Sequence, residues 1–332
     1  MARIGVIGGG AFGTAMACVV RRSGNDVVLW AREPEVAASI NQEALNPLYL
    51  PGVRLVPGIH ATFDLSQACK GADFLLLAPP AQHMRAVAQR LATLLAAGTP
   101  VISCSKGLER SSLALMPEVL AEALPRARIA ILSGPSFARE IAADLPCGVA
   151  LASADPELAR RLALLVANPR FCVVPSDDTV GAAIGGVMKN VVAIASGVAA
   201  GKKLGENARA TLITLGLAEA TRLGLAKGAK RETFDGLAGL GDMMLTANSL
   251  QSRNTSLGVA LGEGRRAEDV LGARKEVTEG AFSAGAVVAL AQRLGVQMPV
   301  ARAVDEVLNR GAALDDAIAR LLAGLGSTVR PA

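Results

Sequence analysis

The sequence predicts an α/β protein, in which an N-terminal Rossmann-like, doubly wound sheet is followed by an all-α C-terminal domain. Up to about residue 175, short β-rich apolar runs alternate with amphipathic helical segments, a pattern typical of a parallel sheet covered by helices. Beyond residue 176 the strand signal stops, and long helical segments rich in Ala, Leu and Gly follow. We therefore expect a dinucleotide-binding domain at residues 1–176 and a helical substrate-binding and catalytic domain at residues 177–332.

The predicted strands are short aliphatic runs, several of them apolar on both faces. Residues 74–77, Phe-Leu-Leu-Leu, indicate a strand buried from both sides. The expected strands are residues 3–7, 26–30, 73–78, 100–104, 128–132, 147–152 and 170–174. Helical patterns cover residues 13–23, 81–96, 113–123 and 156–167, and a longer one covers residues 178–202 with Asp177 or Asp178 as its cap.

Composition excludes several classes of protein. With 51% hydrophobic and 19% charged residues, the chain is far from the polar composition of disordered proteins. Its net charge of +5 comes from scattered Lys and Arg residues without a basic block, so we expect no nucleic-acid partner. A modest positive excess suits a small anionic substrate and a cofactor that carries phosphates.

Cysteine and histidine usage indicates a reduced protein without a metal. Five cysteines are an odd number and never form C-x-x-C, which favours reduced thiols and a cytoplasmic location. The two histidines, His60 and His83, are not at metal-ligand spacing, so no metal is expected. The apolar run at 191–201 is too short for a membrane span, and no signal-peptide pattern precedes the first strand, so we expect no integral membrane segment.

Residues Gly8 to Gly13 form G-x-G-x-x-G directly after a predicted strand and at the start of a predicted helix. In a dinucleotide-binding turn, Gly8 would allow the tight turn, Gly10 would let the backbone approach the pyrophosphate, and Gly13 would allow close packing of helix on strand. The phosphates would lie at the helix N-terminus. The alternative is a glycine-rich turn without a ligand, which this context disfavours.

The end of the second strand bears on the choice of nicotinamide cofactor. Arg32 could pair with a 2′-phosphate, whereas Glu33 could hold the ribose hydroxyls of NAD. Glu33 could also simply precede a helix that begins at Pro34. We favour NADP over NAD.

Three polar residues in the C-terminal half are candidates for chemistry. Lys189 is a lone lysine in an apolar helical run, where desolvation would lower its pKa towards a range useful for catalysis, unless it reaches the surface. Arg253, flanked by Ser252 and Asn254, could bind a phosphate, or could be an ordinary exposed residue. Asp242 could act in the site or could cap a helix.

These segments, in this order, resemble the NAD(P)-dependent glycerol-3-phosphate dehydrogenases of bacterial type. The resemblance extends over nearly the whole chain, so it is more specific than any single motif. The residues that carry it are 8–13, 105–108, 133–138, 188–191, 239–242, 251–254 and 277–280.

This resemblance implies interconversion of dihydroxyacetone phosphate and sn-glycerol 3-phosphate by hydride transfer, a supply of glycerol phosphate for phospholipids, and a homodimer. It implies that Lys189 is the proton acceptor and donor. The implied substrate contacts are Lys106, Gly134, Ser136, Lys189, Asp242, Ser252, Arg253 and Asn254. The implied cofactor contacts are Gly8, Gly10, Ala11, Phe12, Gly13, Arg32, Lys106, Ala138, Arg253, Val277 and Glu279.

The sequence departs from the family pattern at Ala11, where many relatives carry serine. The change removes a possible hydroxyl contact to the pyrophosphate but keeps the backbone N–H. Two other functions stay open on the residues alone: a related dehydrogenase that acts on a β-hydroxyacid, and a dinucleotide-binding sensor without turnover. Arg253 and the Asp242 motif favour a phosphorylated substrate over a carboxylate, and the presence of Lys106 and Lys189 argues against a sensor.

Overall fold

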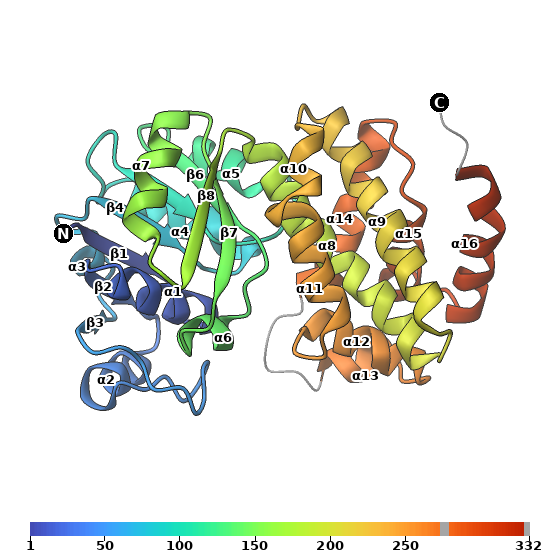
Figure 1. The fold of residues 1–332 in the computed structure, drawn as a ribbon, viewed down its shortest axis with the longest axis horizontal. Helices are drawn as coiled ribbons and strands as arrows, with labels where there is room; N and C mark the ends of the chain where they lie inside the picture. The colour runs from blue at the N-terminus through green and yellow to red at the C-terminus, as the bar shows by residue number, and fades with distance from the viewer. Residues whose placement is uncertain (273–278, 329–332) are drawn as a thin grey trace. The chain divides into compact units, whose positions relative to one another are not determined.

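The computed structural model describes residues 1–272 and 279–328, with side chains described up to residue 323. The chain forms two compact units (Figure 1). Unit 1 consists of Met1–Lys106 and Leu115–Ala183, and unit 2 consists of Gly107–Ala114 and Ile184–Ala332.

Unit 1 contains an eight-stranded sheet in the order β3-β2-β1-β4-β5-β6-β7-β8. All neighbours pair in parallel except β6 and β7, which are antiparallel. The strands are β1 (Arg3–Ile7), β2 (Asp26–Trp30), β3 (Ile59–Thr62), β4 (Phe74–Leu77), β5 (Pro100–Ser103), β6 (Arg128–Ser133), β7 (Cys147–Ala152) and β8 (Phe171–Ser176). The predicted Rossmann-like sheet is confirmed, with two corrections: β3 was not predicted, and one pairing is antiparallel.

Strand β3 gives a weak signal because it is only four residues long and lies at the edge of the sheet. Its His60 is exposed, so the run lacks the continuous apolar pattern of the central strands. The β6–β7 pairing depends on the path of the chain between the strands, which a local pattern does not encode.

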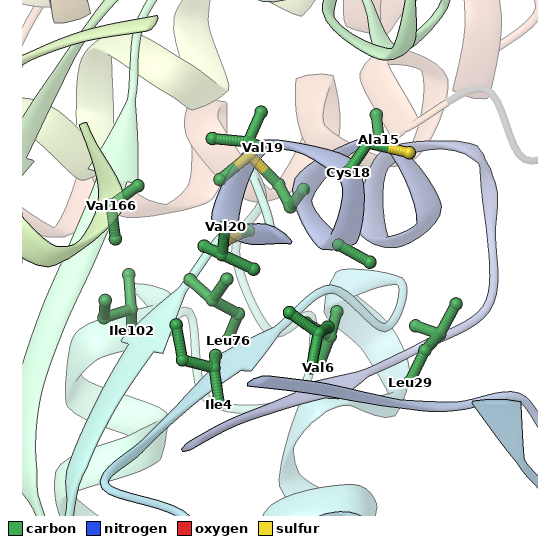
Figure 2. Packing of buried hydrophobic residues seen from close by; sticks show 14 of the residues in the cluster. Ile4, Val6, Ala15, Cys18, Val19, Val20, Leu29, Leu76, Ile102 and Val166 are labelled. Atoms are coloured by element: carbon green, nitrogen blue, oxygen red, sulfur yellow. The ribbon is translucent and has the colours of Figure 1, made fainter. Parts of the chain in front are cut away.

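The core of unit 1 lies between the sheet and helix α1 (Ala11–Arg22). Figure 2 shows side chains of the central strands meeting those of α1 across this interface. Each fully buried aliphatic side chain of this kind stabilises the fold by about 1.5–3 kcal/mol. The labelled residues are Ile4, Val6, Ala15, Cys18, Val19, Val20, Leu29, Leu76, Ile102 and Val166, all of them buried.

The other helices of unit 1 connect the strands. They are α2 (Pro34–Glu43), α3 (Leu65–Cys69), α4 (Met84–Leu91), α5 (Met116–Ala123), α6 (Ala138–Ala142) and α7 (Pro156–Val166), with a short 3₁₀ turn at Ala81–His83. Helix α2 begins at Pro34, so Glu33 does precede a helix, although its side chain makes no capping hydrogen bond.

The described part of unit 2 outside the 107–114 segment is helical, as predicted for the C-terminal domain. Its helices are α8 (Thr179–Gly201, which begins in unit 1), α9 (Glu206–Ala226), α10 (Arg231–Asp235), a π turn (Leu237–Gly241), α11 (Asp242–Asn248), α12 (Arg253–Gly262), α13 (Ala267–Gly272), α14 (Glu279–Arg293), α15 (Pro299–Asn309) and α16 (Leu314–Thr328).

Helix α8 follows the predicted range closely. The Asp178 carboxylate accepts a hydrogen bond of 2.8 Å from the Gly181 N–H, so Asp178 is the cap of the predicted pair. Among the described helices, only α8 has the length and mean hydropathy of a membrane span, because the helix extends well beyond the apolar run at 191–201. Most of it is buried inside the protein (89% of the most apolar stretch), as is usual for a core helix.

Candidate functional site

The glycine-rich turn joins β1 to α1, and its three motif glycines are required for different reasons. Gly8 has a φ of 123°, a conformation that favours glycine. A Cβ on Gly13 would lie 1.9 Å from the Gly8 carbonyl oxygen, so only glycine allows α1 to pack so close to the turn. A Cβ on Gly10 would meet nothing within 4 Å. Of the three, Gly10 alone is therefore unexplained by packing, as expected where a ligand approaches the backbone.

The first turn of α1 begins at Ala11, so the N–H groups of Ala11 and Phe12 belong to the helix N-terminus. Phe12 is half-buried and packs against the core, which holds this turn in place. A helix N-terminus of this kind attracts phosphate through its N–H groups and its dipole. The residues present therefore fit the pyrophosphate of a dinucleotide.

Arg32, Glu33 and Tyr49 form a cluster beyond the carboxyl end of β2. The Glu33 Oε1 atom accepts hydrogen bonds from Arg32 Nη2 (2.6 Å), Arg32 Nε (3.0 Å) and the Tyr49 hydroxyl (3.0 Å). Burial opposes ionisation of Glu33, but the hydrogen bonds from Arg32 and Tyr49 outweigh it, so the pKa of this carboxyl lies below its usual value. An ionised Glu33 and an exposed Arg32 thus stand side by side where a ribose would be recognised.

Lys106 follows β5 and reaches across to the segment that follows β6. Its Nζ donates to the Gly134 carbonyl (2.9 Å) and to Ser136 Oγ (3.5 Å), and Ser136 Oγ donates to the same carbonyl (2.8 Å). Gly134 has a φ of 147°, and a Cβ there would lie 2.9 Å from Val149 Cα. Ala138 is the first residue of α6. The structure thus brings Lys106, Gly134 and Ser136 together at the carboxyl ends of neighbouring strands.

In unit 2, Lys189 of α8 pairs with Asp242, the first residue of α11. The Nζ–Oδ1 distance is 2.5 Å, and the two residues are 9% and 0% exposed. Asp242 Oδ1 also accepts from the Thr246 hydroxyl at 3.3 Å. The alternative in which Lys189 reaches the surface is wrong for this structure. A buried ammonium is compatible with folding only when a partner compensates its desolvation, and Asp242 is that partner.

Ser252 and Asn254 hold the start of α12, and Arg253 lies between them. Ser252 Oγ caps the helix by accepting from the Thr255 N–H (3.2 Å). Asn254 Nδ2 donates to Asn190 Oδ1 (2.9 Å), and its Oδ1 accepts from the Gly280 N–H (3.1 Å). Arg253 is exposed at the first position of the helix. Ser252 and Asn254 thus stabilise the start of α12 by hydrogen bonds within the protein, whereas the Arg253 side chain is exposed.

Of the last two predicted cofactor residues, only Glu279 is among the described residues. Glu279 is the first residue of α14. Val277 lies outside the described residues.

Three residues beside the candidate ones were not predicted as site residues: Tyr49, which bonds to Glu33, Asn190, which bonds to Asn254, and Asn46, which bonds to the Gly9 carbonyl. Tyr49 and Asn46 lie in the segment between α2 and β3, where Asn46-Pro47 indicates only a turn. Asn190 follows Lys189 in the same apolar run, and a second polar residue there was the signal that could have identified it. Nothing local in the sequence distinguishes Asn46 from other turn asparagines.

Thiolate and metal chemistry find little support in the part of the chain that the structure describes. All five cysteines are free, and burial raises the pKa of Cys104 to about 12 and that of Cys69 to about 11. Across residues 1–272 and 279–328, no three His, Cys, Asp or Glu side chains gather as metal ligands.

Comparison with known proteins agrees with this geometry. Residues 3–159 match the family model for the NAD-dependent glycerol-3-phosphate dehydrogenase N-terminus, and residues 178–319 match that for the C-terminus. The chain is 52% identical over 320 residues to glycerol-3-phosphate dehydrogenase (NAD(P)+) of Parvibaculum lavamentivorans, covering 96% of each chain. It is 53% identical to that of Rhodospirillum rubrum, covering 96% of this chain and 91% of the relative. The crystal structure of glycerol-3-phosphate dehydrogenase from Coxiella burnetii superposes with a TM-score of 0.92 at 38% identity, covering 97% of this chain and 98% of the other.

Proposed function

The chain belongs to the NAD-dependent glycerol-3-phosphate dehydrogenase family, and we propose that it interconverts dihydroxyacetone phosphate and sn-glycerol 3-phosphate with NADPH or NADH. The observation that carries this proposal is the buried Lys189–Asp242 pair, because it holds an ammonium in an otherwise apolar helical region of a dinucleotide-binding chain. When bound, the reduced nicotinamide supplies a hydride to the ketone carbon of the substrate.

Residues of unit 1 hold the dinucleotide in this proposal. The N–H groups at the start of α1 bind the pyrophosphate, and the absence of a side chain at Gly10 keeps the approach open. Arg32 reads a 2′-phosphate, and the neighbouring Glu33 carboxylate serves the ribose hydroxyls of NADH. Because the guanidinium fork matches a phosphate, we propose that NADPH is preferred.

Lys189 supplies the proton. As the ketone is reduced, negative charge develops on its oxygen, and the Lys189 ammonium donates a proton to that oxygen; in the reverse direction the neutral amine accepts it. The Asp242 carboxylate holds the ammonium in one orientation, since its Oδ1 atom contacts Nζ directly. A fixed donor in a buried position needs little reorganisation during the reaction.

The phosphorylated substrate explains the remaining predicted residues. Arg253 is exposed at a helix start and offers a planar fork of donors for the phosphate. The family resemblance assigns Lys106 to the substrate as well, and its ammonium donates to the Gly134 carbonyl and to Ser136 Oγ. Ser252 and Asn254 act by holding the start of α12 that carries Arg253.

The wider setting belongs to the same proposal. We assign dinucleotide binding to residues 1–176 and substrate binding and proton transfer chiefly to residues 177–332. The protein is proposed to act in the cytoplasm as a homodimer that supplies glycerol phosphate for phospholipids. Relatives at about half identity are named glycerol-3-phosphate dehydrogenase (NAD(P)+), which supports the glycerol phosphate part of this proposal.

Turnover tests the proposal directly. The purified chain is mixed with NADPH and dihydroxyacetone phosphate, and the loss of reduced-nicotinamide absorbance is followed; the assay is repeated with NADH. A ketoacid of the β-hydroxyacid dehydrogenase type serves as the rival substrate. Rapid loss of absorbance with dihydroxyacetone phosphate, but not with the ketoacid, supports the proposal. Faster turnover of the ketoacid, or cofactor binding without turnover of either substrate, contradicts it.

A further inference from the structure

Asn46 is a fully buried asparagine in the segment between α2 and β3, and all its side-chain hydrogen-bonding directions lead to the dinucleotide region of unit 1. Its Nδ2 donates to the Gly9 carbonyl (2.8 Å) and to Thr14 Oγ1 (2.8 Å). Its Oδ1 accepts from the Tyr49 N–H (3.2 Å). A buried amide with three partners is costly to replace, because each lost bond leaves a buried polar group unsatisfied.

The hydrogen bond to the Gly9 carbonyl determines the orientation of the Gly9–Gly10 peptide in the glycine-rich turn. In a trans peptide the carbonyl and the following N–H point in opposite directions. Because the Gly9 carbonyl is turned towards Asn46, the Gly10 N–H of the same peptide points away from it. Gly10 is also the position where a Cβ would meet no atom within 4 Å. Asn46 therefore orients the N–H at the point where the turn is open.

The hydrogen bond from the Tyr49 N–H connects Asn46 to the cluster of Arg32, Glu33 and Tyr49. Asn46 accepts the Tyr49 N–H, and the Tyr49 hydroxyl donates to Glu33 Oε1 (3.0 Å), the atom that Arg32 also contacts. When Arg32 turns to a 2′-phosphate, the Tyr49 hydroxyl still donates to Glu33, and its dipole offsets part of the carboxylate charge. Without that donor, the carboxylate repels a 2′-phosphate more strongly.

We propose that Asn46 is a positioning residue for the cofactor: it orients the Gly9–Gly10 peptide for the pyrophosphate and, through Tyr49, ties that turn to the Arg32–Glu33 cluster that selects between NADPH and NADH. The inference rests on the proposed dinucleotide binding but not on the identity of the substrate. Asn46 thus sets the affinity for both cofactors, and Tyr49 sets the ratio between them.

The test measures the Kd of NADPH and of NADH by the fluorescence of the reduced nicotinamide. Asn46→Asp keeps the shape but loses both amide donors, so both Kd values should rise roughly 10- to 100-fold. The KM for NADPH should rise more than kcat falls. Thr14→Val removes one partner of Asn46 and the 3.3 Å contact of Thr14 Oγ1 with the Gly9 carbonyl but keeps the Asn46–Gly9 bond, and it should raise both Kd values about 2- to 5-fold.

Asn25→Asp is the matched control. Asn25 is also buried in unit 1; its Oδ1 accepts from the Ala2 N–H, and its Nδ2 donates to the Val20 and Leu165 carbonyls. The same chemical change there should lower stability but leave both Kd values within about twofold of wild type. If Asn46→Asp and Thr14→Val behave like Asn25→Asp, the proposal is wrong.

Tyr49→Phe tests the second half of the connection in a protein that keeps the Asn46 contacts. The NADPH Kd should rise about 3- to 10-fold, with the NADH Kd within about twofold. In a Glu33→Gln background the same change should have no selective effect, since no carboxylate charge remains. An equal loss for both cofactors, or a selective loss that persists in the Glu33→Gln background, overturns this half. Because the readout is binding, a wild-type chain that binds both dinucleotides without reducing dihydroxyacetone phosphate contradicts the proposed function and leaves this test intact.

Discussion

The two units use glycine for different reasons. In unit 1, Gly8 and Gly134 follow strands and have positive φ, so the local turn requires them. In unit 2, Gly197 of α8 and Gly258 of α12 lie inside helices, and a Cβ on either would come within 2.2 Å or 2.1 Å of a backbone carbonyl oxygen of the other helix. The need for glycine at a turn follows from the local backbone conformation. The need for glycine at a helix crossing is explained only by the second helix that packs against it.

Helix capping shows the same contrast. Asp155 of unit 1 caps its own helix α7 by accepting from the Leu158 and Glu157 N–H groups, and the Leu158 N–H together with Arg128 holds its pKa below the usual value. In unit 2 the start of α15 is bound instead by Glu219 of α9, which accepts from the Val300 N–H (2.6 Å) and the Ala301 N–H (3.1 Å). Glu219 is fully buried, and burial raises its pKa to about 7. The cap of α7 therefore comes from an adjacent residue that is partly exposed, whereas the cap of α15 comes from a buried residue of another helix.

The same difference separates the groups proposed to bind the cofactor in unit 1 from the groups proposed to transfer the proton in unit 2. Unit 1 presents backbone N–H groups and surface-facing side chains at strand ends, which suits the binding of phosphates. Unit 2 holds buried polar side chains between helices, as in the Lys189–Asp242 pair. We therefore expect substitutions in unit 1 to affect binding first, and substitutions of buried groups in unit 2 to affect turnover or stability.

The largest expected effect is that of Lys189→Ala, which should reduce kcat by roughly 10²- to 10⁴-fold, because the reaction loses its proton donor. The dinucleotide Kd should stay nearly unchanged, since the glycine-rich turn proposed to bind the pyrophosphate is in unit 1. Steady-state kinetics and a cofactor titration on the same sample check both points. A folded Lys189→Ala variant with near-normal kcat would contradict the assignment of the proton donor.

Glu219→Gln tests the buried cap through pH. The folded-state pKa of about 7 lies above the ordinary value of 4.5, so the contribution of Glu219 is fully present below pH 4.5 and is lost as pH rises through about 7. The stability of wild type relative to Glu219→Gln should fall across this window by at most about 3 kcal/mol. Urea unfolding at pH 5 and pH 8 measures it. A relative stability that rises with pH would mean that the two N–H bonds outweigh burial.

Arg253→Ala should lower kcat/KM for dihydroxyacetone phosphate by roughly 10- to 150-fold, the effect of losing a charge-assisted partner of the phosphate. Arg253→Lys should recover only part of it, because a point charge does not reproduce the planar fork. Unphosphorylated dihydroxyacetone is the control, and the mutation should matter much less for it. If both ketones lose the same factor, Arg253 serves the cofactor or the fold instead.

The smallest expected effect sharpens the contrast between binding and stability. Gly10→Ala adds a Cβ in open space at a φ of −68°, so the melting temperature should change little. The dinucleotide Kd should nevertheless rise about 10-fold, or about 1.4 kcal/mol, because the new methyl group occupies the approach to the turn. Thermal unfolding measures the first effect and cofactor titration the second. An unchanged Kd would show that the cofactor does not approach the backbone at Gly10.

Much of unit 1 followed from the sequence because its signals are local. Strand β1, the glycine-rich turn and the start of α1 are adjacent in the chain; Gly8 is required there by its φ value, and Gly13 by the carbonyl of Gly8 five residues earlier. The extent of α8 was predicted to within a residue at each end, since its cap and its apolar run are contiguous. The short edge strand β3 escaped because four residues with an exposed histidine carry too little periodicity.

The sequence by itself therefore determined the fold class, the glycine-rich turn after the first strand and which polar residues interrupt apolar runs. Only the tertiary structure decided their partners: Asp242 for Lys189, the Gly9 carbonyl for Asn46, and the start of α15 for Glu219. The physical reason is range. Periodicity, caps and φ preferences act within a few residues, whereas the partner of a buried polar group depends on which faces of distant segments are brought together by packing.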